Sequence, residues 1–175
     1  STLTNLQKII EKNIEIELIP TYSFERKYWR DAVLYSHRDR PSCEISATIT
    51  IDYETDNKEP WPIWILNDKN YAGFNNANAF AVSQSKNEAE RIKAGCKRIL
   101  TYPGDILVYQ GVNVLHWRDP LDGEWARQIF VHYVNKNGPF YQEFPELEFD
   151  GRKSLYHTYD DNYRNYKVVK ELNET

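Results

Sequence analysis

The sequence has little cysteine, no long apolar run and only a small excess of negative charge. The two cysteines, Cys43 and Cys96, are too few for a disulfide framework, and the lack of a Cys-x-x-Cys pair argues against structural zinc. No apolar run approaches the ~20 residues that a membrane span needs. The net charge of −4 is scattered along the chain, so the sequence predicts neither a nucleic-acid partner nor a membrane partner.

These features predict a single soluble domain over residues 1–175, with enough residues for a core. Residues 1–15 contain Lys8, Glu11 and Lys12 within an amphipathic pattern, which is unlike a secretory signal. We therefore expect a cytoplasmic protein in which both cysteines are reduced.

The N-terminal residues predict a helix followed by a strand. Thr4 and Gln7 have the spacing of a capping box, and the apolar residues after them predict a helix of about ten residues. From Ile14 to Ile19, isoleucine and leucine alternate with glutamate, which predicts a strand that Pro20 ends.

The remaining segments predict a mainly β protein with flanking helices. Strands are expected at Cys43 to Tyr53, Trp61 to Leu66, Ile106 to Tyr109 and Gln128 to Val134, and Asp122-Gly123 is a hairpin signal. Short strands with turn residues between them favour an antiparallel sandwich or barrel such as a jelly roll. The polar residues 67–98, with a short helix at Asn87 to Ala94, are a candidate lid. The Tyr-rich tail 139–175 is expected to be a covering segment or partly disordered.

The most informative residues are His37, Asp39 and His116. In an extended segment, His37 and Asp39 leave the same face, and with a distant second histidine they can occupy one face of an Fe(II) octahedron. Composition alone yields a histidine followed two residues later by an acid in about half of such chains. The alternatives are a surface turn in which Asp39 caps or pairs with Arg40, and an interior His116 whose hydrogen bonds are satisfied.

Arg127 opens an apolar strand eleven residues after His116. One interpretation is an ordinary cation at the surface end of a strand. If Arg127 is instead buried, it needs an anionic partner, and the distal carboxylate of 2-oxoglutarate is one.

The chain resembles the iron(II)/2-oxoglutarate-dependent oxygenases, on the prolyl 4-hydroxylase-like side and among its small bacterial and phage-type members. The resemblance covers about residues 21–138. It rests on Tyr28, HRD at 37–39, CEISATITIDY directly after it, WPIWI at 61–65 and PGDILVYQGVNVLHWRDPLDGEWARQIFVHYV at 103–134.

The resemblance implies a double-stranded β-helix in which His37, Asp39 and His116 bind Fe(II). It further implies that Arg127 anchors the C5 carboxylate of 2-oxoglutarate and that Tyr28 bonds this carboxylate or lines its pocket. The expected reaction consumes O2 and 2-oxoglutarate, releases succinate and CO2, and hydroxylates a protein residue such as proline or a small molecule. Ascorbate is an optional additional cofactor.

The chain departs from the family pattern at two positions and leaves one ambiguity. Asp31 stands where relatives often have glycine, and Ile129 stands where many have a serine that touches the co-substrate. If Arg127 faces inward, Gln128 and His132 face outward; the opposite parity places those two in the cavity. His132 is then the fallback anchor, or a group that supports the metal ligands, or a histidine satisfied within the sheet.

Two other functions compete with the oxygenase. A non-enzymatic, aromatic-rich jelly-roll binding module with a degenerate metal site predicts that the three ligand side chains lie apart or bond to other groups. A zinc hydrolase with the same ligands predicts a further acid or base beside the metal and no need for Arg127.

Overall fold

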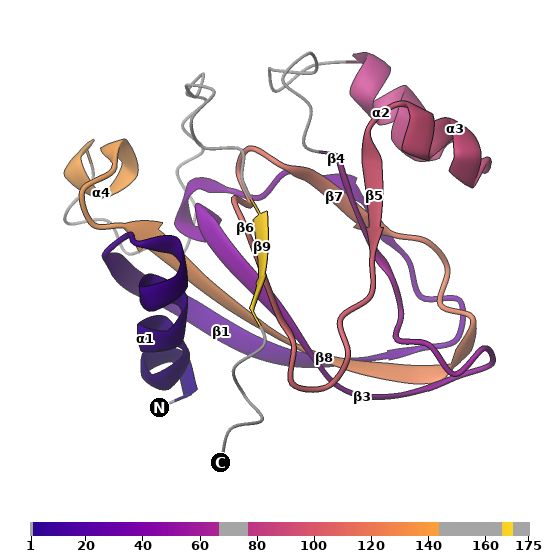
Figure 1. The fold of residues 1–175 in the computed structure, drawn as a ribbon, viewed down its shortest axis with the longest axis horizontal. Coiled ribbons are helices and arrows are strands. Elements are labelled where there is room, and N and C mark those ends of the chain that lie inside the picture. Colours follow the sequence, from indigo (N-terminus) through magenta and orange to yellow (C-terminus); the bar gives the residue numbers. More distant parts are fainter. Residues whose placement is uncertain (1, 67–76, 144–165, 170–175) are drawn as a thin grey trace.

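The computed structural model describes residues 2–66, 77–143 and 166–169, and within them two antiparallel sheets face each other (Figure 1). The larger sheet has the order β1-β8-β3-β6-β9, formed by Leu18–Trp29, Gly123–Asn135, Ile45–Thr55, Ile106–Tyr109 and Tyr166–Val169. The smaller sheet has the order β2-β7-β4-β5, formed by Leu34–His37, Leu115–Arg118, Ile63–Leu66 and Cys96–Ile99. The predicted class, a mainly β double-stranded β-helix or jelly roll, is confirmed.

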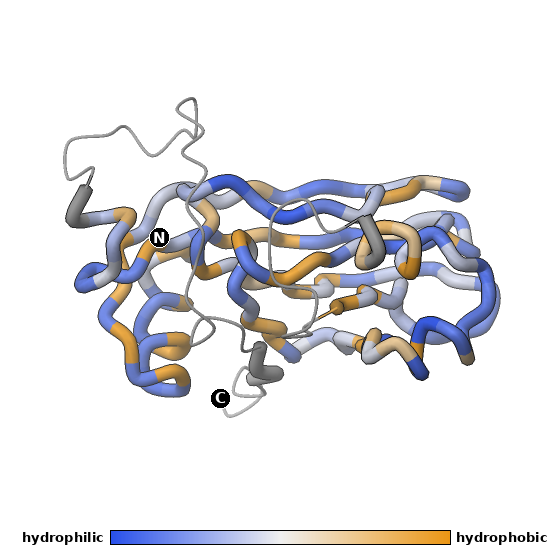
Figure 2. The backbone as a smooth tube through the Cα atoms, turned by 90° about the horizontal axis from the view of Figure 1, so that it is seen from above, coloured by the Kyte–Doolittle hydropathy of each residue, from blue (hydrophilic) through white to orange (hydrophobic). Residues whose placement is uncertain are grey.

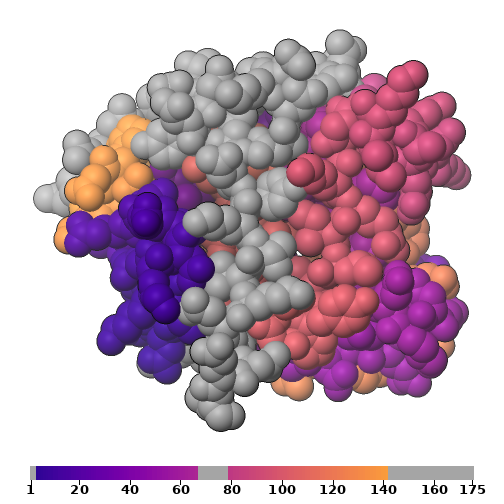
Figure 3. All heavy atoms as spheres, in the orientation of Figure 1, coloured from indigo at the N-terminus to yellow at the C-terminus, as the bar shows by residue number. Residues whose placement is uncertain are grey.

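The helices are short and lie outside the two sheets. They are α1 (Thr2–Ile14), the 3-10 turn η1 (Pro41–Cys43), α2 (Ala77–Gln84), α3 (Glu88–Lys93) and α4 (Pro139–Glu143). Figure 3 shows α1 in indigo on one side of the molecule and the α2–α3 region in pink on the other. No helix in the described ranges has the length and apolar character to cross a bilayer.

Strand β3 explains how the larger sheet serves both a core and a cavity. Its alternation directs Ile45, Ala47 and Ile49 to the outer face, where they form a core with Leu6 and Ile10 of α1. Along the tube in Figure 2, hydrophobic and hydrophilic stretches accordingly alternate within the strands.

The opposite face of β3 carries Ser46, Thr48 and Thr50, all of them buried. Thr48 and Thr50 hydrogen-bond to Gln128 of β8, the strand that pairs with β3. Buried hydroxyls need such partners. The face of β3 directed at the smaller sheet is therefore polar, and the cavity described below lies on the same side of the larger sheet.

The N-terminal expectations were partly wrong. Helix α1 begins at Thr2 and runs to Ile14, so Thr4 lies inside it and no capping box starts there. Strand β1 starts only at Leu18 and continues through Pro20 to Trp29. Pro20 is tolerated because β1 is the edge strand of its sheet, and the register with β8 shifts between Pro20 and Tyr22.

The other local predictions also had mixed outcomes. Asp122-Gly123 does not form a hairpin, because it connects β7 of the smaller sheet to β8 of the larger one. The predicted helix at Asn87 to Ala94 is confirmed as α3, where the Asn87 side chain accepts bonds from two backbone N–H groups. Of the proposed lid 67–98, residues 67–76 lie outside the described residues, and most of the tail 139–175 does too.

Candidate metal centre and cavity

Three predicted ligands meet where the smaller sheet faces the larger one. His37 is the last residue of β2 and pairs in register with His116 of β7, with the ring centroids 4.3 Å apart. Asp39 Oδ1 lies 3.3 Å from His37 Nε2 and 3.5 Å from His116 Nε2. Two neighbouring ligands of an octahedral ion at ~2.1 Å are about 3 Å apart, so these spacings fit binding to one metal ion.

Asp39 lies just beyond the end of β2, not within a strand as the motif suggested. Its position comes from a backbone bond in which Asp39 N–H donates to Gly111 O at 2.8 Å. Gly111 itself packs closely: a Cβ there would lie 2.3 Å from Asp39 Oδ2 and 2.4 Å from Cys43 O. A glycine at 111 is therefore required by close approach to the carboxylate.

Backbone carbonyls fix the orientation of both imidazoles. His37 Nδ1 lies 2.7 Å from Tyr35 O, and His116 Nδ1 lies 2.8 Å from Val114 O. A carbonyl can only accept, so each Nδ1 carries the proton and each neutral ring directs the Nε2 lone pair toward Asp39. This is the support that metal-binding histidines usually have.

The charges of the three groups are coupled. Burial lowers the pKa of His37, but the hydrogen bond and the charge of Asp39 outweigh burial and raise it overall. Burial also opposes ionisation of Asp39, yet the two imidazoles hold its pKa far below the usual range. Asp39 is thus a carboxylate at any pH at which the protein functions, as a metal ligand must be.

Ser46 connects Asp39 to His132. Its Oγ donates to Asp39 Oδ2 at 3.0 Å and lies 2.9 Å from His132 Nδ1. Because the hydroxyl proton is used on the carboxylate, His132 Nδ1–H donates to Ser46. Burial lowers the pKa of His132 to about 4, so its ring is neutral near pH 7.

Asp39, Cys43 and His132 form a second convergent group within 4.8 Å. It shares its carboxylate with the first group. Burial raises the pKa of the Cys43 thiol to about 11, and Tyr22 Oη lies 3.0 Å from its sulfur. A thiol that stays protonated is a poor metal ligand, so the His37–Asp39–His116 set is the better site.

The triad opens into a cavity of about 360 Å³ between the sheets. Its lining combines aromatic rings, basic side chains and the ligands: Tyr22, Phe24, Arg26, Tyr28, Leu34, His37, Arg38, Asp39, Arg40, Cys43, Ile63, Tyr109, His116, Trp117, Arg118, Phe130 and His132. Asp39 is the single acid among the described residues of that lining. The cavity is therefore suited to an anionic ligand.

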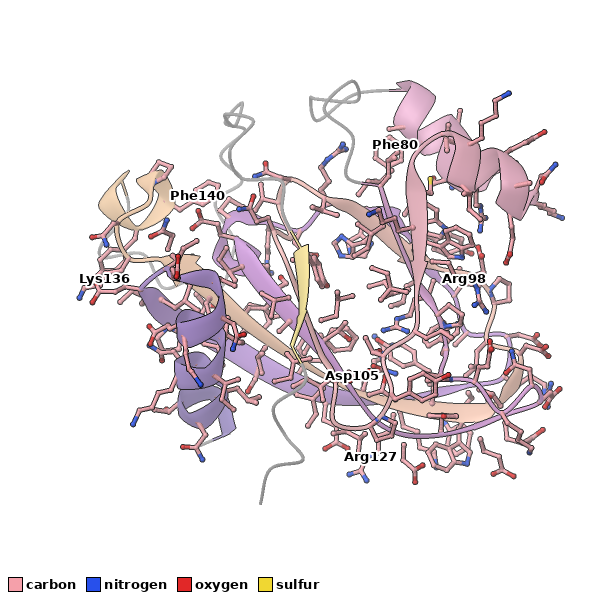
Figure 4. The ribbon with its side chains drawn as sticks, in the orientation of Figure 1. Phe80, Arg98, Asp105, Arg127, Lys136 and Phe140 are labelled. Carbon is pink, nitrogen blue, oxygen red and sulfur yellow. The ribbon has the colours of Figure 1, made fainter. Side chains whose placement is uncertain are left out.

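Arg127 does not line this cavity, which corrects the inward-facing prediction. Figure 4 shows its side chain pointing away from the body of the molecule, and it pairs with Glu25 at the surface. Strand β8 has the opposite parity, so Gln128 and His132 face inward. Ile129, two residues from Arg127, packs against the outer core instead.

Arg118 is the buried cation that the sequence interpretation missed. It is 1% exposed and borders the cavity, where it donates to Trp61 O and, at 3.4 Å, to Thr48 Oγ1. Its Nε has no partner, and no acid in the described residues pairs with it. Burial lowers the pKa of Arg118 to about 10, which still leaves it charged at neutral pH. The signal was present as His116-Trp117-Arg118, because residues i and i+2 of a strand share a face.

Tyr28 lies where the resemblance implied, on the cavity wall. It is 7% exposed, and its ring centroid is 5.1 Å from that of Trp61, which also lies under Arg118. Asp31, the departure from glycine, has φ of 65°. This left-handed conformation suits glycine best and aspartate tolerably.

Comparisons with known proteins show the fold. No family model and no curated protein sequence matches the chain. Among solved structures it is similar to HygX from Streptomyces hygroscopicus with nickel and 2-oxoglutarate bound, at 13% identity and a TM-score of 0.54, covering 90% of this chain and 74% of HygX. HygX with iron bound matches at 13% identity and a TM-score of 0.52, over 90% of this chain and 75% of HygX.

AviO1 from Streptomyces viridochromogenes Tue57 matches at 16% identity and a TM-score of 0.50, over 77% of this chain. The chain spans 58% of the length of AviO1. These similarities show an oxygenase-like fold of the HygX type and do not select the prolyl 4-hydroxylase-like branch.

Proposed function

We propose that the protein is an Fe(II)- and 2-oxoglutarate-dependent oxygenase that hydroxylates a C–H bond of a protein residue, proline included, or of a small molecule. The observation that carries this proposal is that one cavity is lined both by the convergent His37, Asp39 and His116 and by the buried Arg118, which forms no ion pair with an acid of the described residues. A metal site alone is common to several reaction classes. A deep cation beside it matches a co-substrate with two carboxylates.

The three ligand side chains are suited to Fe(II), because two imidazoles and one carboxylate on one face leave three positions open. When bound, the metal and 2-oxoglutarate supply the oxidation of the C–H bond with O2, releasing succinate and CO2. The chain orients both imidazoles through Tyr35 O and Val114 O and holds Asp39 through Ser46.

Arg118 takes the role that the resemblance assigned to Arg127, as the anchor of the distal carboxylate. Its burial among Trp61, Tyr28 and Thr48 leaves a charge without a counterion, and a carboxylate arriving there relieves that cost. Tyr28 lies on the same wall and hydrogen-bonds the carboxylate or shapes its pocket. His132 acts through Ser46 on the orientation of Asp39 and does not anchor the co-substrate.

The two competing functions have less support. A binding module with a degenerate metal site predicted separated ligand side chains, whereas Asp39 lies within 3.5 Å of both imidazoles. A zinc hydrolase needs an acid or base beside the metal. The described lining offers no second carboxylate, and the nearby His132 uses Nδ1 on Ser46.

The deciding experiment is an anaerobic titration of the protein with Fe(II) and 2-oxoglutarate, followed by visible absorption. We expect a weak, saturable charge-transfer band from chelation of the keto acid at a ferrous site, lost in Asp39→Ala and retained in the surface control Asp52→Ala. Circular dichroism establishes that both variants are folded. Folded, iron-replete wild type without a band would overturn the oxygenase assignment and favour the binding module.

The same titration has a predictable pH dependence. Protons compete with metal for the imidazoles, and Asp39 raises the pKa of His37 in the metal-free protein. Iron affinity should therefore fall as pH is lowered through the pKa of His37. Asp39 remains ionised and so does not contribute to that loss.

A further inference from the structure

The arginines of the described chain divide into two groups by their partners. Away from the cavity each pairs with acids: Arg30 with Asp56 and Glu124, Arg91 with Asp119, Arg98 with Glu59 and Glu88, and Arg127 with Glu25. Four arginines line the cavity: Arg38 donates to Asn113 O at 3.2 Å, and Arg26, Arg40 and Arg118 form no ion pair with an acid of the described residues. Among the arginines of the described residues, Arg26, Arg40 and Arg118 on the cavity lining thus lack an acidic partner.

Arg26 belongs to the inward face of the edge strand β1. Tyr22, Phe24, Arg26 and Tyr28 alternate along that face and all line the cavity, whereas Glu25 points to the outer side with Arg127. The guanidinium of Arg26 lies 5.2 Å from the ring centroid of Tyr28. Arg26 is exposed, which places it at the mouth of the cavity and not at its base.

Arg40 approaches the same mouth from the loop that carries Asp39. Its guanidinium lies 5.1 Å from the ring centroid of Tyr22, which in turn packs against His132 at 4.6 Å. Stacking on an aromatic face orients a guanidinium, and although Arg40 also interacts with the Tyr22 hydroxyl and the Cys43 thiol, a guanidinium has five N–H donors. Both arginines therefore present donors to whatever enters beside the metal ligands.

The wall between these arginines is apolar. Phe24 and Phe130 stack at 4.9 Å between centroids, and Leu34 and Ile63 also line the space. Arg118 lies deeper, at 1% exposure, and under the proposed function it accounts for one carboxylate of 2-oxoglutarate. Arg26 and Arg40, at the mouth of the cavity, are therefore available to bind a different molecule.

We propose that Arg26 and Arg40 bind an anionic group, carboxylate or phosphate, on the primary substrate, and that an apolar part of the same substrate packs on Phe24 and Phe130. This rests on the proposed function, because it takes the second ligand of the cavity to be the molecule that is oxidised. Bidentate pairs with arginine suit carboxylate and phosphate alike, and burial of the apolar part strengthens them.

Calorimetric titration of the Fe(II)- and 2-oxoglutarate-loaded protein, kept anaerobic, tests the proposal with three probes: phenyl phosphate, benzoate and the uncharged benzamide. The variants are Arg26→Gln and Arg40→Gln. Arg127→Gln is the matched control, since it removes an exposed arginine from the outer face of the neighbouring strand. Phosphate and carboxylate sources are distinguished by which of the two anions binds more tightly.

We expect an anionic probe to bind at least about tenfold more tightly than benzamide. Arg26→Gln and Arg40→Gln should each lower the affinity for that anionic probe by about tenfold or more. Arg127→Gln should bind as the wild type does, and all three variants should retain wild-type affinity for 2-oxoglutarate. Raising the salt concentration should weaken the binding of the anionic probes and leave the affinity for benzamide unchanged.

The proposal is overturned if benzamide binds as well as the anions, if no anion binds to the loaded protein, or if the cavity variants match Arg127→Gln. It is also overturned if Arg26→Gln and Arg40→Gln lower the affinity for 2-oxoglutarate as much as the affinity for the probes. Both arginines would then belong to the co-substrate site. If wild type binds neither Fe(II) nor 2-oxoglutarate yet binds an anion in an Arg26- and Arg40-dependent way, the anion site stands and the oxygenase function fails.

Discussion

His116 and Arg118 are separated by one residue on β7, and both side chains border the same cavity. The strand repeat places their Cα atoms ~7 Å apart on one face. One side chain is a candidate metal ligand and the other a candidate anchor for a carboxylate. A single rigid strand thus sets the distance between the candidate metal and the candidate anchor.

Replacing Arg118 by glutamine should therefore separate co-substrate binding from metal binding. Loss of a desolvated charge pair costs about 2–5 kcal/mol, so we expect the affinity for 2-oxoglutarate to fall by at least about 30-fold. Fe(II) affinity should be retained, because no metal ligand is touched. Anaerobic titration of each ligand separately measures both effects, and Arg127→Gln should behave as wild type. Equal 2-oxoglutarate affinity in Arg118→Gln would show that the anchor is elsewhere.

Gly111→Ala is expected to damage the metal centre from the backbone side. The added Cβ would lie 2.3 Å from Asp39 Oδ2 and 2.7 Å from Ser46 Oγ, so the carboxylate must move or the turn must shift. Overpacking of this kind costs about 1–3 kcal/mol of unfolding free energy. Metal affinity should fall with it. Urea unfolding and iron titration test both effects, and wild-type metal affinity in the variant would mean that Asp39 has room to relax.

Ser46→Ala removes a hydroxyl that no sequence pattern singled out. It deprives Asp39 Oδ2 of a donor at 3.0 Å and His132 Nδ1 of its acceptor at 2.9 Å. Loss of such a supporting group typically lowers metal affinity by about 10–100-fold. Ser83→Ala is a matched control, because Ser83 is also buried but bonds to Ser36 and Phe80 O. If both variants bind iron equally well, Ser46 is structural only.

The sequence was sufficient to predict the elements that depend on local pattern. Strand β3 follows from β-branched alternation, and α3 follows from an Asn87 cap and helix-forming residues. The spacing of His37, Asp39 and His116 also predicted their meeting, because a jelly roll pairs β2 with β7. Each of these features depends on one segment or on one pairing that the fold class already implies.

The predictions that failed depend on which face of a strand a side chain occupies and on tertiary contacts. Whether Arg127 or Gln128 faces inward is set by the register of β8 between two neighbours, and shifting that register by one residue exchanges the faces. Arg118 was overlooked because a polar residue at a strand end is usually exposed, and its burial comes from Thr48 of β3 and from Trp61, which precedes β4. The role of Ser46 likewise exists only after β3 and β8 have paired.

Glu44 provides a prediction about stability and pH that is independent of the metal. Its side chain is 1% exposed, and Oε2 accepts from Asn135 N at 2.8 Å. Burial, opposed in part by that bond, raises the pKa of Glu44 from 4.5 to about 7. Since the folded state prefers the protonated form, this stabilising contribution is complete below pH 4.5 and is lost as pH rises through about 7.

Glu44→Gln keeps an acceptor for Asn135 N and removes the ionisation. The variant should therefore match wild type near pH 4.5 and exceed its unfolding free energy above pH 7, by up to about 3 kcal/mol for a shift of this size. Urea unfolding across that pH range measures the difference, with the exposed Glu17→Gln as control. A difference that does not change with pH would mean that Glu44 ionises as easily in the folded protein as in the unfolded chain.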